Sequence, residues 1–440
     1  MKKRIASLVL ATAMVSTMAA CSGGSAPAGG STAAGTTAAP ATTAAPAGDT
    51  KAAGDTTTAA AGGEAAASGE TFKLGAYLQL SGGNAAYGIE ARNAIQMAVD
   101  YVNENGGFNG AQVEFVPYDT QGSAEEAVKI VSKLVEVEKA DAVIGSVNSS
   151  EVFAAAGSLN KQGIYTIGLG TSPSWMEEDW PYVFRAAMNN GFAVPITVDM
   201  LEDLEMKSVG VFYGQDDASL ATGNSFMDEC KARGIEVVKS ESYDQGDTDF
   251  SAQVANLISA KPDCIYISVI GETGPVIVKQ LRQYGYSGII FDKESFMASQ
   301  IAIAGEENSN YIAFANPYVT YASIEECDIP EVKEFLEKYQ AKYGEIAKTD
   351  SSYRGWDTVM VMWEASKIAG KNDSDSLKDA TNKISGLQGL GGILDYTKGN
   401  REGYNTFNSF ILIDGKNILW KDWIANGGYD EYKTATGNEK

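Results

Sequence analysis

FKLGAYLQLSGGNAAYGIEARNAIQMAVDYVNENGGFNG, at residues 72–110, contains two hydrophobic periodicities in one stretch. Its first nine residues have the apolar and aromatic composition of a buried β-strand. Four apolar side chains then recur at the spacing that places them on one face of a helix: Ala91, Ile95, Ala98 and Val102. The passage predicts a strand at 72–80 and a helix at 85–104, which form the first βα unit of the chain.

The alternation of strand and helix continues through the rest of the chain. A capping box, Ser123-x-x-Glu126, opens the next predicted helix, and Thr248 is expected to cap a later one. A second βα series begins near residue 192. The expected strands lie at 113–119, 141–145, 164–169, 207–213, 235–243, 264–270 and 287–292. We therefore expect an α/β fold of two doubly wound lobes with central, mainly parallel sheets, joined by a multi-strand hinge.

The expected crossings between the lobes divide the chain near residues 190, 317 and 400. YIAFANPYV, at 311–319, has the composition of a crossing strand. The predicted N-terminal lobe comprises 71–191 plus 318–402, and the predicted C-terminal lobe comprises 192–317 plus 403–440. A ligand site would lie between them, at the carboxyl ends of the strands.

The N-terminal 70 residues have no pattern of a packed core. Lys2, Lys3 and Arg4 precede an apolar run, so we expect a signal peptide at 1–20. Met18-Ala19-Ala20-Cys21 resembles a bacterial lipobox, which predicts lipidation of Cys21 and anchoring to the outer side of the cell membrane. Residues 21–70 are rich in Ala, Thr, Gly and Pro, and are expected to form a flexible linker behind the lipid anchor.

Composition excludes several classes of function. The net charge of −23 disfavours phosphate backbones, so we expect no nucleic-acid partner. The chain has no histidine, which removes Ser-His-Asp and Cys-His catalysis and most zinc sites. It has no GxGxxG or GxxxxGK motif either. We expect a monomeric protein that is not an enzyme and has no cofactor or metal, with Cys230, Cys264 and Cys327 as buried thiols.

Two strand-to-helix turns are rich in hydroxyl and amide groups. IGSVNSSE, at 144–151, and IGLGTSPSW, at 167–175, both follow apolar runs. One interpretation is that Ser149 caps its helix and Thr171 opens a turn. The other is that both hydroxyls converge on a carboxylate held at the helix N-terminus. Glu294, just after the strand at 287–292, is either a solvated turn residue or the partner of a cation.

The passage at 75–110 also resembles the opening of the branched-chain amino-acid-binding proteins of ABC importers, which have the type I periplasmic-binding fold. The resemblance rests on Ser81-Gly82, Tyr87-Gly88, Asn103 and the run Gly106-Gly107-Phe108-Asn109-Gly110. It extends from about 72 to about 425 through YDTQGSAEEAV (118–128), DAVIGSVNSSE (141–151), GTSPS (170–174), GDTDFSAQVANLISAKPDCIYI (246–267) and the helix after Gly355-Trp356-Asp357.

The resemblance implies a role for each candidate site residue. Tyr87 would cover the ligand, Ser149 and Thr171 would hold its α-carboxylate, and Glu294 would bind its α-ammonium. Main-chain groups would come from Val147, Asn148, Leu169 and Gly170. The second lobe departs from the family, because Ser219 and Ile270 stand where aromatic residues are usual. Trp175 is a candidate replacement for one of these aromatic walls.

These observations predict a solute-binding lipoprotein that delivers a small amino acid, branched-chain or similarly uncharged, to the permease of an ABC importer. Three alternatives stay open at this point. The protein could serve a sensory membrane partner, it could bind an amide or a short peptide, or it could be an enzyme on the same scaffold. No Lys or Arg is placed by a motif to meet an acidic ligand side chain.

Overall fold

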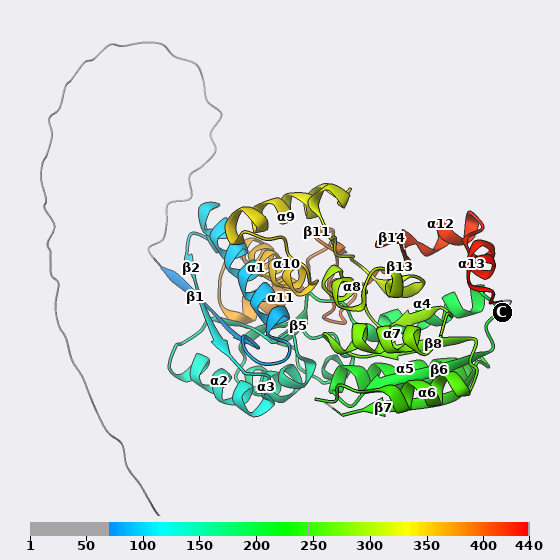
Figure 1. The fold of residues 1–440 in the computed structure, drawn as a ribbon. Coiled ribbons are helices and arrows are strands. Elements are labelled where there is room, and N and C mark those ends of the chain that lie inside the picture. Colours follow the sequence, from blue (N-terminus) through cyan, green and yellow to red (C-terminus); the bar gives the residue numbers. More distant parts are fainter. Residues whose placement is uncertain (1–69, 245, 439–440) are drawn as a thin grey trace, which may run out of the picture. The chain divides into compact units, whose positions relative to one another are not determined.

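The computed structural model describes residues 70–244 and 246–438. Helices cover two central β-sheets in this part of the chain (Figure 1). A third sheet has only two antiparallel strands, β11 (Leu387–Gly389) and β12 (Gly392–Leu394). The predicted α/β class with two mainly parallel sheets is confirmed.

The first sheet contains five parallel strands in the order β2-β1-β3-β4-β5. The order places β1 beside β3, so successive βα units run outward from β1 in opposite directions. This reversal creates a crevice at the carboxyl ends of the strands, where α/β proteins bind ligands. The strands are β1 (Thr71–Leu78), β2 (Gln112–Asp119), β3 (Ala142–Ile144), β4 (Tyr165–Gly168) and β5 (Val183–Arg185).

Side-chain alternation along β1 assigns different helices to the two faces of the first sheet. Leu74, Ala76 and Leu78 enter one apolar core, whereas Tyr77 enters another on the opposite face. The first core includes residues of α1 (Ala85–Glu104), α9 (Pro330–Tyr343), α10 (Ser351–Ala369) and α11 (Ser374–Thr381). The second core includes residues of α2 (Ala124–Glu136) and α3 (Ser149–Lys161).

The second sheet contains seven strands in the order β14-β13-β10-β9-β8-β6-β7. The strands from β10 to β7 are parallel, and β13 and β14 add an antiparallel edge. The strands are β6 (Ser208–Gly214), β7 (Glu236–Tyr243), β8 (Cys264–Ser268), β9 (Ile290–Asp292), β10 (Ile312–Asn316), β13 (Asn408–Ile413) and β14 (Lys416–Leu419). The helices of this part are α4 (Asn190–Asp203), α5 (Asp217–Ala232), α6 (Ser251–Ser259), α7 (Thr273–Gln283), α8 (Ala298–Ala304), α12 (Trp420–Ala425) and α13 (Gly428–Thr436).

Three segments connect elements of the first sheet with elements of the second. They lie at 186–189, between β5 and α4, at 317–329, between β10 and α9, and at 405–407, before β13. The predicted crossing strand at 311–319 is wrong in its extent. Its regular part, β10, ends at Asn316 and belongs to the second sheet, because Pro317 has no N–H to continue the ladder. The division of the chain into two lobes at these segments remains a prediction.

Two further sequence predictions can be compared with the structure. Helix α6 begins at Ser251 with Phe250 as its N-cap, so Thr248 does not cap it. Cys230, Cys264 and Cys327 are buried free thiols, as expected, and burial raises the pKa of Cys230 to about 12. Within 70–244 and 246–438, no helix combines the length and apolar character needed to cross a bilayer. The predicted signal peptide, Cys21 and linker lie outside these residues.

Candidate functional site

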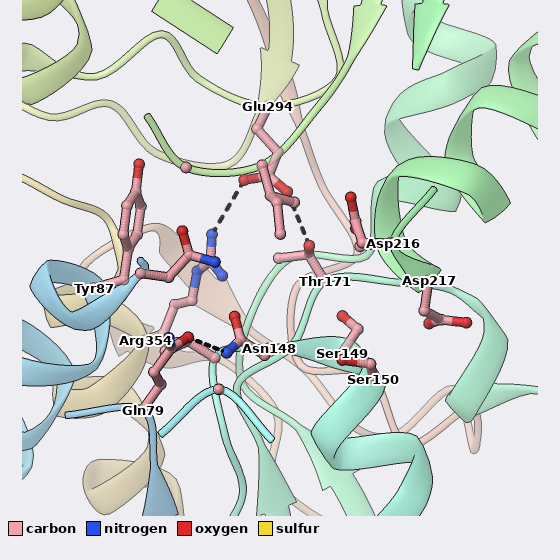
Figure 2. Close-up of a pocket in the computed structure, with 16 residues that line it drawn as sticks. Gln79, Tyr87, Asn148, Ser149, Ser150, Thr171, Asp216, Asp217, Glu294 and Arg354 are labelled. Atoms are coloured by element: carbon pink, nitrogen blue, oxygen red, sulfur yellow. Dashed lines mark hydrogen bonds and ion pairs between the residues drawn. The ribbon is translucent and has the colours of Figure 1, made fainter. Parts of the chain in front are cut away.

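A cavity of about 720 Å³, including its open mouth, lies where the carboxyl ends of strands from both sheets approach one another. Figure 2 shows Gln79, Asn148 and Ser149 on the side of the first sheet, with Glu294 facing them from the second sheet. The lining residues are Gln79, Asn84, Tyr87, Gly122, Val147, Asn148, Ser149, Ser150, Thr171, Asp216, Asp217, Ala218, Ile270, Gly271, Glu294 and Arg354.

The N-terminus of α3 forms one wall of this cavity. Asn148 is the N-cap residue, but among the described residues its side chain makes no capping hydrogen bond. The Ser149 hydroxyl accepts a hydrogen bond from the backbone N–H of Ser172, at 3.0 Å, in the turn after β4. The capping interpretation of Ser149 is therefore wrong. The unpaired N–H groups of the first helical turn and their positive partial charge remain available beside the cavity.

The turns after β3 and β4 approach closely because residue 170 is a glycine. A Cβ atom at Gly170 would lie 2.7 Å from the Ser149 hydroxyl oxygen and 2.9 Å from its Cα atom. Any other residue would push the two turns apart. Glycine at this position therefore sets the spacing between Ser149 and Thr171, the two hydroxyl residues that line the cavity.

Glu294 follows β9, and its carboxylate accepts hydrogen bonds from residues that are distant in sequence. Its Oε1 atom accepts hydrogen bonds from the Thr171 hydroxyl at 2.9 Å and from the Asn190 amide at 3.0 Å. The same oxygen lies 2.7 Å from the Lys293 ammonium, and Oε2 lies 3.7 Å from the Arg354 guanidinium. The interpretation of Glu294 as a solvated turn residue is wrong, since its side chain is only 14% exposed.

Neighbouring cations keep Glu294 ionised. Burial alone would raise the pKa of Glu294, but Lys293 and Arg354 outweigh burial and lower that pKa to about 2. The Lys293 side chain is fully buried, so its charge is weakly screened by solvent. The cavity therefore contains a carboxylate that is negative at every physiological pH.

Arg354 comes from α10 and is the buried cation that lines the cavity. It donates to Asp350 one turn earlier on the helix, to the Leu169 carbonyl at 3.3 Å and to the Tyr318 hydroxyl at 3.1 Å. Burial raises the pKa of Asp350, while its ion pair with Arg354 opposes that rise. Sequence reasoning missed this arginine, because α10 is distant in sequence from every strand-end motif.

The floor of the cavity is an amide pair. The Asn148 Nδ2 atom donates to the Gln79 Oε1 atom at 2.5 Å and to the Glu151 Oε1 atom at 2.9 Å. Gln79 is 5% exposed and Glu151 is fully buried. Neither Gln79 nor Glu151 was predicted as a site residue, although both lie within the quoted motifs.

The wall on the side of the second sheet carries two acidic side chains and one small apolar side chain. Asp216 caps α5 by accepting from the backbone N–H of Ser219 at 2.9 Å, and Asp217 accepts from the Ser174 hydroxyl at 2.8 Å. Ala218 lines the cavity between them. Ser219, which was predicted to line the site, is fully buried and lies outside the lining residues.

The predicted site residues fall into two groups. Seven of them line the cavity together: Tyr87, Val147, Asn148, Ser149, Thr171, Ile270 and Glu294. Leu169, Gly170 and Ser219 do not line it. Trp175 is also excluded as an aromatic wall, because it is fully buried with the guanidinium of Arg185 4.1 Å from its ring centre.

Comparisons with known proteins agree with this architecture. The family model described as periplasmic binding protein matches residues 71–411. Leu/Ile/Val-binding protein homolog 3 of Brucella melitensis is 23% identical over 346 residues, which cover 78% of this chain and 92% of that protein.

Two solved structures share 27% sequence identity and a TM-score of 0.69 with this chain. One is the branched-chain amino acid transporter substrate-binding protein LivJ of Streptococcus pneumoniae in complex with isoleucine, with 79% of this chain and 98% of that chain covered. The other is the leucine-binding protein LivK of Thermotoga maritima, with 79% and 97% covered. The chain therefore belongs to the periplasmic binding protein family. It is a solute-binding protein that acts outside the cytoplasm, in a family of transporter components rather than enzymes.

Proposed function

We propose that this periplasmic binding protein captures a small free amino acid between its two sheets and delivers it to the permease of an ABC importer. The observation that carries the proposal is the pairing of opposite recognition chemistry across one cavity. Hydroxyl groups and the N-terminus of α3 lie on one wall, and the ionised Glu294 lies on the other.

The first wall has the chemistry to hold an α-carboxylate. The hydroxyls of Ser149 and Thr171 and the N–H groups at the start of α3 are hydrogen-bond donors, and the helix dipole favours a negative charge there. Val147 and Asn148 also line this wall, and the proposal assigns their main-chain groups to the same carboxylate. Leu169 and Gly170 act behind it in this proposal, by positioning Arg354 and Ser149.

The opposite wall has the chemistry to hold an α-ammonium. Glu294 supplies the negative charge, and its low pKa keeps that charge in place. Tyr87, whose hydroxyl pKa is raised by burial, stays a neutral ring beside the ligand position. Removing a carboxylate that pairs with a desolvated ammonium is costly, which makes Glu294 the strongest determinant of an amino-acid head group.

One observation favours a second candidate, an organic acid without an amine. Glu294 already contacts the Lys293 ammonium at 2.7 Å and the Arg354 guanidinium at 3.7 Å. A carboxylate with two cationic neighbours attracts an additional ammonium less strongly, while Arg354 could attract an acid directly. An amide or a short peptide would accept hydrogen bonds from the same hydroxyl and N–H donors, and an amide would carry no carboxylate charge.

A thermal-shift and calorimetric screen separates these candidates. Each amino acid is measured beside its amide and its des-amino acid, since these analogues remove one end of the head group at a time. A hundredfold excess of ligand over its Kd stabilises the folded state by about 2.7 kcal/mol. The proposal requires that at least one free amino acid shifts the melting temperature and that both analogues do not. A des-amino acid that binds as well as its parent replaces the proposal with the second candidate.

Delivery and anchoring belong to the same proposal. Lipid on Cys21, followed by the linker at 21–70, would hold the binding domain at the cell membrane, close to a permease. The same arrangement would serve a sensory membrane partner instead. Uptake of the identified ligand by cells with and without the gene distinguishes transport from sensing, because a pure sensor leaves uptake unchanged.

A further inference from the structure

The orientation of the Asn148 side chain is fixed by the groups behind it. Its Nδ2 atom lies 2.9 Å from a Glu151 carboxylate oxygen and 2.5 Å from the Gln79 Oε1 atom. The Gln79 amide oxygen can only accept a hydrogen bond, so the NH2 group of the Asn148 amide, rather than its oxygen, faces Gln79 and Glu151. The Asn148 Oδ1 atom is then directed into the cavity (Figure 2).

Glu151 is suited to this positioning role. It is fully buried in the first turn of α3, directly behind Asn148. Within the described part of the chain, its second carboxylate oxygen has no hydrogen-bond partner. Among the described residues, the hydrogen bond from Asn148 is the one that the Glu151 carboxylate accepts.

Two acidic residues also line the cavity, Asp216 and Asp217. One carboxylate oxygen of each already accepts a hydrogen bond, from the Ser219 N–H and from the Ser174 hydroxyl. The apolar lining is small and comes from Val147, Ala218 and Ile270. An aliphatic ligand side chain would leave the oriented Asn148 oxygen without a partner, and a buried acceptor without a partner opposes binding.

We propose that the bound amino acid has a side chain that ends in a hydrogen-bond donor, a hydroxyl or a carboxamide, which Asn148 selects through its oriented oxygen. This inference rests on the amino-acid function proposed above and names the substrate class of the same cavity. It narrows the sequence-based expectation of a branched-chain or similarly uncharged amino acid to the uncharged side chains that carry a donor.

Two pairs of isosteric amino acids test the inference on the unmodified protein. Asparagine and leucine have the same shape, as do threonine and valine, but only the first of each pair carries a donor. Calorimetric titration of the full chain should give at least one pair in which the donor-bearing amino acid binds roughly tenfold more tightly, the size expected for one buried hydrogen bond.

Substitutions then assign the preference to Asn148. Asn148→Leu keeps the side-chain volume and should abolish or reverse the ratio of affinities within the pair. Glu151→Gln can donate to the Asn148 oxygen and let the amide turn, so it should reduce that ratio while the protein still binds. Asn382→Leu, an exposed change at the C-cap of α11, is the matched control and should leave the ratio as in wild type. Melting curves without ligand check that each variant is folded.

The outcomes separate this inference from the function on which it rests. Leucine and valine binding at least as tightly as asparagine and threonine overturns the donor preference and leaves the amino-acid function intact. A preference that survives in Asn148→Leu overturns the assignment to Asn148. Failure of every free amino acid to bind overturns the proposed function, and this inference with it.

Discussion

The Thr171 hydroxyl donates a hydrogen bond to the Glu294 carboxylate at 2.9 Å, although the two residues follow strands of different sheets. The contact joins the proposed carboxylate wall to the proposed ammonium wall. Asn190 donates to the same Glu294 oxygen and to the Thr171 hydroxyl, so these three residues form one polar cluster. A zwitterionic ligand would compete for the same donors and the same carboxylate.

Glu294→Gln should weaken amino-acid binding more than Ser149→Ala. Loss of one hydrogen bond to a charged group costs about 1.5–3 kcal/mol, which is roughly tenfold to 150-fold in affinity. The Glu294 substitution also leaves an ammonium in a desolvated site without its counter-charge, which adds to the cost. Calorimetric titration measures both variants, with the exposed Glu337→Gln as the charge-matched control. Wild-type affinity in Glu294→Gln would remove the cation site from the proposal.

Ligand binding should bring the two lobes closer together. The connecting segments at 186–189, 317–329 and 405–407 provide the positions for a hinge, and closure lowers the local dielectric and strengthens the pairing with Glu294. Small-angle X-ray scattering should give a smaller radius of gyration at saturating ligand than without it. Superimposable scattering profiles would show that the solute binds without closure.

Asp357→Asn should make the stability of the protein less dependent on pH. Burial raises the pKa of Asp357 to about 7, although hydrogen bonds from Tyr404 and from the backbone of Leu390 act to lower that pKa. Between about pH 4 and pH 7 the folded state retains a proton that the unfolded state has released. The free energy of unfolding therefore falls as pH rises, by up to about 1.4 kcal/mol per pH unit for this carboxyl group.

Denaturant titrations at several pH values measure that slope directly. Burial also raises the pKa of Asp292 to about 7. Asp292 contributes the same slope to wild type and to Asp357→Asn, so its contribution cancels when the two slopes are subtracted. The exposed Asp228→Asn is the control and should leave the slope unchanged. Equal slopes for wild type and Asp357→Asn would mean that Asp357 is ionised in the folded protein throughout this range.

Cys21→Ala should release the protein from the membrane fraction. A thioether-linked diacylglycerol binds a bilayer through about 0.8 kcal/mol for each buried CH2 group, and the variant cannot carry it. Fractionation of cells that express each form, followed by immunoblotting, measures the distribution. Retention of Cys21→Ala on membranes would point to anchoring by some means other than lipidation of this cysteine.

Much of the fold was predictable because the βα units are locally encoded. Helix α1 has the predicted bounds of 85–104, and Ser123 caps α2 through the backbone N–H of Glu126, as the capping box predicts. The short strand β5 and the helix α8 were missed, since three to seven residues are too few to establish a hydrophobic period. Strand β10 was predicted too long because its role depends on its neighbours β9 and β13.

The candidate site was only partly predictable. Ser149, Thr171 and Glu294 follow strand ends, where sequence position alone suggests convergence, and all three line one cavity. Arg354 is contributed by a helix, and its approach to the cavity depends on the packing of α10 against α1. The displacement of Ser219 by Ala218 is a difference of one residue at the start of α5, which a motif comparison cannot resolve.

Asn190 has a position whose consequence extends beyond solute recognition. It begins α4 directly after the connecting segment at 186–189, and its amide contacts both Thr171 and Glu294. A rotation of one lobe about that segment would therefore alter the hydrogen bonds of the solute site itself. Solute affinity and lobe orientation are then coupled equilibria, and thermodynamic reciprocity applies to them. A membrane protein that selects one lobe orientation would shift the affinity for the solute by the same factor by which the solute shifts the affinity for that membrane protein.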